Sequence, residues 1–145
     1  MYSSIVVGTD GSPTAIEAVR QATRLAKALS ATLHVVSAYR DDAGAAPAPG
    51  EAPLEYGDAR LGTRGVMEVM LAGIQRRLTA EGLKVEIHAV AGHPVAALLG
   101  VARDSGAQLI VVGNKGMQGP RRVLGSVPNS ISHQAPCDVL IVNTT

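Results

Sequence analysis

Five short runs of aliphatic residues, separated by longer helical patterns, limit how this chain can fold more than any other feature. The runs cover residues 5–7, 33–38, 85–90, 109–112 and 139–142. Several of them are continuous stretches of Val, Ile and Leu, without alternating polar residues. Such stretches are typical of strands that are buried on both faces, as in a parallel sheet. The runs therefore predict five strands of a parallel sheet.

Helical patterns occupy the intervals between these runs. Apolar residues recur at three- and four-residue spacing over 13–29, 61–78 and 94–102, which predicts three amphipathic helices. Ser12 is suited to cap the first helix and Pro13 to begin it. A short fourth helix is predicted over 127–133, ending before Pro136. Strands that alternate with helices predict right-handed crossovers and a three-layer α/β sandwich.

The length of 145 residues suits a single domain covering 1–145. Residues 41–57 are rich in Ala, Pro and Gly and are expected to form a flexible loop after the second strand. The net charge of +1 gives no basic field for binding nucleic acid or an anionic membrane. With no long apolar segment and no basic N-terminal region, a cytoplasmic location is expected.

Two glycine-rich loops follow the first and fourth predicted strands, at residues 8–12 and 113–119. In a doubly wound sheet the first strand is usually central, and ligands bind where the strand order reverses. Glycines let backbone amides approach a ligand, and helix starts favour anions. Residues 8–12 equally fit a simple turn with a helix cap. Residues 113–126 fit neither the P-loop nor the Rossmann pattern.

The sequence resembles the universal stress protein family over nearly its whole length. The matching segments are residues 5–12 (IVVGTDGS), 92–94 (GHP), 109–113 (LIVVG), 124–127 (LGSV) and 135–142 (APCDVLIV). The ATP-binding branch of that family carries a glycine motif, which Gly113, Gly116, Gly125 and Ser126 match here. The resemblance implies a doubly wound five-stranded parallel sheet with strand order 3-2-1-4-5, similar to adenine nucleotide α-hydrolases. It also implies a regulatory or stress-response module that binds an adenine nucleotide.

The same resemblance implies roles for single residues. Asp10 would lie near the adenine and ribose, and the backbone around Ala38 would contact the adenine edge. The start of the last helix would hold phosphate. Arg122 is a candidate contact of the phosphate, and otherwise a solvated loop residue. Asp10 is also the candidate ligand for Mg²⁺ with a triphosphate, and otherwise a turn residue. The expected nucleotide contacts are Gly8, Thr9, Asp10, Ala38, Val112, Gly113, Asn114, Gly116, Arg122, Gly125, Ser126 and Val127.

Two departures from the ATP-binding pattern bear on which nucleotide is bound. Eight residues separate Gly116 from Gly125, whereas the family motif has nine. Pro128 stands where that pattern often has a hydroxyl residue, and proline offers neither a hydroxyl nor an N–H. One lost hydrogen bond to a charged group costs about 1.5–3 kcal/mol, or about one to two decades in affinity. The glycine motif still leads us to expect ATP first. The two departures make cyclic AMP or AMP the alternatives.

The remaining chemistry-bearing residues indicate no catalytic cluster, so at most weak ATP hydrolysis is expected. No two of the four histidines show metal-ligand spacing on one element, and His34 and His88 are expected to be packed or edge residues of strands. Cys137 is expected to be a structural thiol. The last strand would be an apolar sheet edge, which pairing in a two-fold dimer would cover. The strand residues expected at this homodimer interface are Val139, Leu140, Ile141 and Val142.

Overall fold

β1 lies in the middle of a five-stranded parallel sheet whose order is β5-β2-β1-β6-β7. This computed structural model describes residues 1–40, 55–56, 59–60, 63–114 and 127–144. Taken in chain order, the five strands have the expected order 3-2-1-4-5, so the predicted doubly wound sheet is confirmed. The strands are β1 (Ser4–Gly8), β2 (Thr32–Tyr39), β5 (Val85–Ala91), β6 (Leu109–Gly113) and β7 (Asp138–Val142).

The central position of β1 follows from its sequence. Its three aliphatic residues Ile5, Val6 and Val7 are all 0% exposed, so both faces of the strand are covered. Val7 pairs with Val35 of β2 on one side and with Val111 of β6 on the other. A strand that alternated polar and apolar residues would place side chains that need water inside this sheet.

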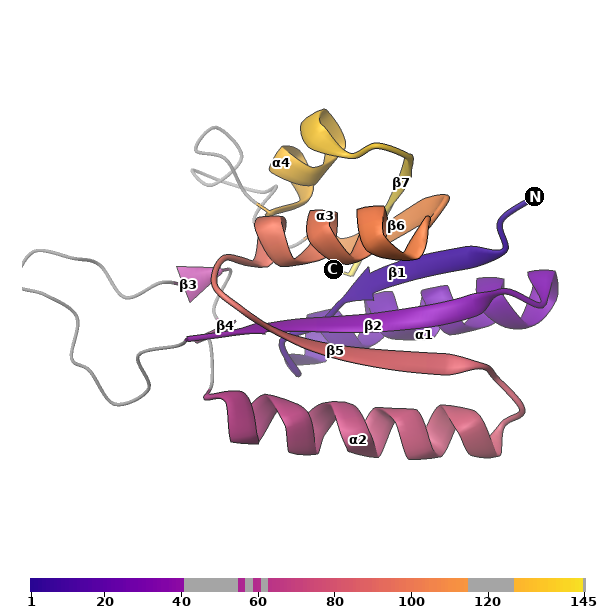
Figure 1. The fold of residues 1–145 in the computed structure, drawn as a ribbon, viewed down its shortest axis with the longest axis horizontal. Coiled ribbons are helices and arrows are strands. Elements are labelled where there is room, and N and C mark those ends of the chain that lie inside the picture. The colour runs from indigo at the N-terminus through magenta and orange to yellow at the C-terminus, as the bar shows by residue number, and fades with distance from the viewer. Residues whose placement is uncertain (41–54, 57–58, 61–62, 115–126, 145) are drawn as a thin grey trace, which may run out of the picture.

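Two helices cover each face of the sheet. α1 (Pro13–Leu29) and α2 (Arg64–Ala80) pack on one face, and α3 (Pro94–Ser105) and α4 (Val127–Gln134) pack on the other. Figure 1 shows α2 and α3 on opposite sides of the strands. Within the described residues, no helix is long and apolar enough to span a membrane. The three-layer sandwich expected from the sequence is therefore the observed architecture.

Capping residues decide where the helices begin and end. The Ser12 side chain accepts a hydrogen bond from the backbone N of Ala15 at 3.2 Å, which caps α1 as expected. α2 begins at Arg64, later than the predicted residue 61, because Thr63 is its N-cap. α3 extends past the predicted residue 102 to Ser105, where Gly106 in the left-handed conformation ends it.

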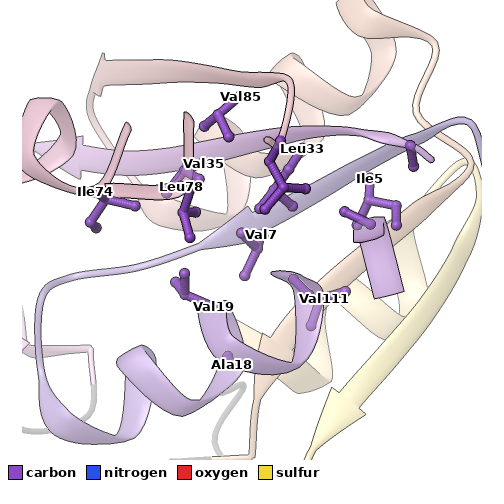
Figure 2. Close-up of a cluster of buried hydrophobic side chains, with 14 of the residues drawn as sticks. Ile5, Val7, Ala18, Val19, Leu33, Val35, Ile74, Leu78, Val85 and Val111 are labelled. Atoms are coloured by element: carbon purple, nitrogen blue, oxygen red, sulfur yellow. The ribbon is translucent and has the colours of Figure 1, made fainter. Parts of the chain in front are cut away.

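Aliphatic side chains fill the core on both faces, because the chain has no Phe and no Trp. On the α1 and α2 face, Figure 2 shows Val7 of β1 pointing toward Ala18 and Val19 of α1. On the α3 and α4 face, Val6 and Ile110 belong to a second buried cluster. Full burial of one such aliphatic side chain contributes about 1.5–3 kcal/mol, so these layers fix the strand ends that carry the candidate site.

Two further short strands were not predicted. β3 (Glu55–Tyr56) and β4 (Ala59–Arg60) form a separate antiparallel pair. Residues 55 and 56 lie inside the segment expected to be a loop, and strands this short carry no readable periodicity. Residues 41–54 and 57 of that segment lie outside the described residues.

Candidate functional site

The strand order reverses between β1 and β6, and the candidate site lies at their carboxyl ends. The crossover after β1 runs through α1 to β2, whereas the segment after β6 leads through α4 to β7 on the opposite face. Val7 and Val111 are partners in the sheet, so the glycines that end the two strands, Gly8 and Gly113, lie at the same edge. In sheets of this kind, ligands usually bind in the crevice where neighbouring strands lead to opposite faces, so this edge is the candidate ligand position.

Hydrogen bonds hold the loop after β1 in one conformation. The backbone N of Thr9 donates to the Val36 carbonyl at 2.9 Å, which joins the loop to β2. The Thr9 hydroxyl accepts from the Gly11 N at 3.1 Å, and Asp10 Oδ1 accepts from the Ser12 N at 2.8 Å. Asp10 thus serves as the turn residue before α1, which is the alternative that the sequence leaves beside a role in Mg²⁺ binding.

Ser37 of β2 also holds this loop in place. It was not among the site residues predicted from the sequence. Its side chain is 1% exposed, and its hydroxyl donates to the carbonyl of Thr9. The signal in the sequence is that Ser37 is one of two polar residues, with His34, in the otherwise aliphatic run 33–38. The next residue, Ala38, is buried and pairs with Val90 of β5, which places its backbone at the same sheet edge.

The end of β6 is closely packed. Val112 is buried, and a side chain at Gly113 would place its Cβ 3.1 Å from the Thr144 methyl group. Asn114 fixes the segment after β7, because its backbone N donates to the Val142 carbonyl at 2.9 Å. The Asn114 Oδ1 also accepts from the N and the hydroxyl of Thr144, at 3.0 and 2.8 Å. Both hydrogen bonds to Thr144 occupy the side-chain oxygen of Asn114. The backbone of Asn114 is therefore the better candidate contact for a ligand.

The start of α4 meets the same edge. Val127 packs against a buried cluster on the α3 face, to which Ala38 at the end of β2 and Val112 at the end of β6 also belong. Pro128, the second residue of α4, is buried and has no N–H to offer. The structure describes eight of the expected contact residues, seven at or just after the carboxyl ends of β1, β2 and β6 and Val127 at the start of α4. The other four, Gly116, Arg122, Gly125 and Ser126, lie outside the described residues.

A comparison with protein-family models identifies the family: the model described as the universal stress protein family matches residues 1–143. The chain belongs to the universal stress protein family. Universal stress protein Rv1636 of Mycobacterium tuberculosis is 38% identical to it over 148 residues, covering 99% of this chain and 98% of the relative. The resemblance seen in the sequence motifs is thus confirmed over nearly the whole chain.

Solved structures of universal stress proteins share this fold. One of them, in complex with cAMP, has a TM-score of 0.78 and 34% identity, covering 99% of this chain and 98% of its own. The Rv1636 crystal structure has a TM-score of 0.60 and 37% identity, covering 99% of this chain and 97% of its own. A protein from Archaeoglobus fulgidus, in complex with dAMP, is 21% identical with a TM-score of 0.65, covering 98% of each chain, and shows the fold alone.

Two further residues that sequence reasoning considered for chemistry have structural roles in this universal stress protein. His93 caps α3, because its Nδ1 accepts from the Val95 N at 3.1 Å, and burial lowers the pKa of its imidazole. This cap occupies the Nδ1 of His93. Cys137 packs against the cluster on the α3 face. Burial and the neighbouring Asp138 carboxylate raise the pKa of its thiol, which is the character of a structural thiol and not of an activated nucleophile.

Proposed function

We propose that this universal stress protein binds an adenine nucleotide in the crevice between β1 and β6, and that binding makes it a regulatory module. The observation that carries the proposal is that the ends of β1, β2 and β6 lie at one edge of the sheet where the strand order reverses, with Val127 of α4 packed on the cluster that holds Ala38 and Val112. The solved relative at 34% identity, in complex with cAMP, supports it because that relative is covered over 98% of its length.

The proposed contacts divide between the two ends of the nucleotide. The buried backbone at Ala38 and the loop at Gly8, Thr9 and Asp10 would face the adenine and ribose. The backbone of Val112, Gly113 and Asn114 would follow the ribose toward the phosphate. The N-terminus of α4 favours an anion through its amides and its dipole, so Val127 would meet the phosphate. Gly116, Arg122, Gly125 and Ser126 would complete the phosphate contacts.

Two observations favour cyclic AMP over ATP as the bound nucleotide, although the sequence motif placed ATP first. Pro128 removes one amide and one side-chain hydroxyl from the first turn of α4, which reduces the contacts for a terminal phosphate. A single phosphate needs fewer donors, so it loses less. The solved relative described above is in complex with cAMP. ATP, with Mg²⁺ near Asp10, remains the second candidate.

Calorimetric titration of the full chain tests the proposal. The ligands are cyclic AMP, AMP and ATP, with GMP as a control nucleotide that carries a different base. We expect one site, with cyclic AMP bound more tightly than ATP and with no binding of GMP. Pro128→Ser restores a hydroxyl and an amide, so it should raise ATP affinity by about 10–100-fold. The exposed Pro136→Ser is the matched control and should change nothing. Absence of binding by all three adenine nucleotides would refute the site, whereas tighter binding of ATP would refute only the cyclic AMP preference.

Slow ATP hydrolysis in the same crevice is the alternative that a phosphate-release assay addresses. We expect at most weak turnover, because the residues proposed to contact the nucleotide include no catalytic cluster. Steady turnover that Gly125→Ala abolishes would make the chain an enzyme and not a binding module.

We also propose that the protein is a homodimer through β7. This strand ends the described sheet on one side, and Leu140 on it is 37% exposed. An exposed aliphatic edge strand is prone to pair with another chain, and a two-fold dimer covers it. Light scattering after size exclusion should give twice the chain mass, and Leu140→Lys should give the monomer. A monomeric wild-type protein would refute the dimer.

A further inference from the structure

A cluster of metal-ligand type side chains lies on the α3 face of the sheet, away from the nucleotide crevice. His34 Nδ1 is 3.0 Å from His88 Nε2 and 3.2 Å from a carboxylate oxygen of Glu86. All three candidate ligand atoms lie within 4.8 Å of one another. The pairing of β2 with β5 produces this arrangement, because His34 is the partner of Glu86 and His88 follows two residues later on the same face.

The sequence alone does not predict this cluster, because its members lie on two different strands, β2 and β5. Within single elements, no two histidines have metal-ligand spacing. The register between β2 and β5, which sequence alone does not reveal, places the three groups together. The readable signal was the Glu-x-His pair at 86 and 88, which alternation puts on one face of a strand.

The cluster opens to a cavity and is separate from the nucleotide crevice. Its three residues line a cavity of about 450 Å³ together with Lys84, just before β5, and Asp104 at the end of α3. The Glu86 side chain is 55% exposed, whereas that of His34 is 7% exposed, so solutes can reach the group from one side. His34 lies four residues before Ala38, which is roughly 13 Å along an extended strand.

Hydrogen bonding alone does not satisfy this cluster. An imidazole nitrogen carries either one proton or one lone pair, and His34 Nδ1 faces both His88 Nε2 and the Glu86 carboxylate. If Nδ1 is protonated, its one proton is shared between two acceptors. If Nδ1 is unprotonated, it accepts from a protonated His88 Nε2, but its lone pair also faces the negative carboxylate at 3.2 Å. The Ser4 hydroxyl oxygen, which is buried without a hydrogen-bond partner among the described residues, lines the same cavity.

A cation at the meeting point of the three groups resolves this conflict, since it accepts all three electron pairs at once. Tetrahedral Zn²⁺ binds His nitrogen and carboxylate oxygen at about 2.0–2.2 Å, which separates neighbouring ligand atoms by about 3.3 Å. The observed separations of 3.0 and 3.2 Å come close to that spacing before any adjustment. Mg²⁺ and Ca²⁺ prefer oxygen ligands only, so two imidazoles select against them.

We propose that His34, Glu86 and His88 form a binding site for a divalent transition cation, with Zn²⁺ as the representative ion. Water, or the carboxylate of Asp104 across the cavity, supplies the fourth ligand. The ion joins β5, an edge strand of the described sheet, to β2 through side chains as well as through the backbone. Burial lowers the pKa of both imidazoles, which keeps their lone pairs available near neutral pH.

Calorimetric titration of the chelator-treated full chain with Zn²⁺ tests the site, and Co²⁺ serves as the spectroscopic probe. We expect one equivalent of Zn²⁺ to bind, and Co²⁺ to give the intense visible absorption of a tetrahedral site. Loss of even an outer-shell partner weakens metal binding by about 10–100-fold, so His88→Ala and Glu86→Gln should each weaken it by at least that much. His133→Ala, which removes an exposed histidine of α4, is the matched control and should leave binding unchanged.

The two test variants replace partly exposed groups, so they should keep the fold, and circular dichroism verifies that they do. Absence of Zn²⁺ binding by the wild type would overturn the proposal. Binding that survives both His88→Ala and Glu86→Gln, or a weak octahedral Co²⁺ spectrum, would overturn it as well. The nucleotide titrations should give the same affinities for the His88→Ala variant, so the outcome here is independent of the proposed function.

Discussion

Gly11→Ala should destabilise the protein, because this glycine occupies a conformation and a space that alanine does not tolerate. Gly11 has φ of +82°, and a Cβ built on it would lie 2.7 Å from the sulfur of Met70 on α2. The residue lies between Asp10 and the cap of α1, so it sets the path of the loop at the proposed nucleotide site.

The magnitude follows from three separate contributions. A left-handed conformation costs an L-residue about 1–2 kcal/mol, and the lower entropy of the unfolded alanine chain offsets about 0.4–1 kcal/mol of that. The contact with Met70 adds about 1 kcal/mol of overpacking, since a flexible side chain relieves part of it. We therefore expect the free energy of unfolding to fall by about 1–2 kcal/mol.

Urea denaturation of four proteins separates the conformational and the steric parts. The wild type, Gly11→Ala, Met70→Ala and the double variant form a cycle, in which Gly11→Ala should cost less when Met70 is absent. Gly73→Ala is the matched control, because a Cβ at this helical position of α2 meets nothing within 4 Å. Alanine should stabilise there by about 0.5–1 kcal/mol. A Gly11→Ala variant as stable as the wild type would refute the reasoning.

Three further outcomes follow from buried polar groups. Ser37→Ala leaves the Thr9 carbonyl without its buried donor and should lower the free energy of unfolding by about 1–3 kcal/mol, as measured in urea. The pKa values of His34 and His88 are lowered by burial below the ordinary 6.5, so the unfolded chain binds more protons. Stability of the metal-free protein should therefore fall as the pH falls below 6.5, and His88→Gln should flatten that dependence. Because its raised pKa keeps Cys137 protonated, iodoacetamide should alkylate it at pH 8 more slowly than it alkylates a free peptide thiol.

The sheet could be predicted from the sequence because its strands carry their own signal. Residues 5–7 and 109–112 are aliphatic on both faces, which is typical of strands in a covered parallel sheet. Capping chemistry explains where the boundaries moved. Thr63 and Gly106 set ends of α2 and α3 that the apolar periodicity alone did not define.

The candidate sites were predictable to different degrees. The carboxyl ends of β1 and β6 follow from topology, so the order of strands and helices along the chain was enough to place Gly8 and Gly113 at the crevice. Ser37 and the cluster at His34 depend on which residues face each other across strands. That register comes from packing of the whole sheet, and β2 and β5 are separated by all of α2.

The central place of β1 also has a consequence for the chain while it is being made. Ile5 finds one partner in Leu33, but its partner on the other side is Leu109. At about 5–20 residues per second, roughly 5–20 s of translation pass between the synthesis of β1 and the synthesis of β6. Throughout that interval one side of the central strand lacks its neighbour, and its unpaired edge invites association with other nascent chains. Ribosome-associated chaperones should therefore cross-link to residues 4–8 until β6 has emerged.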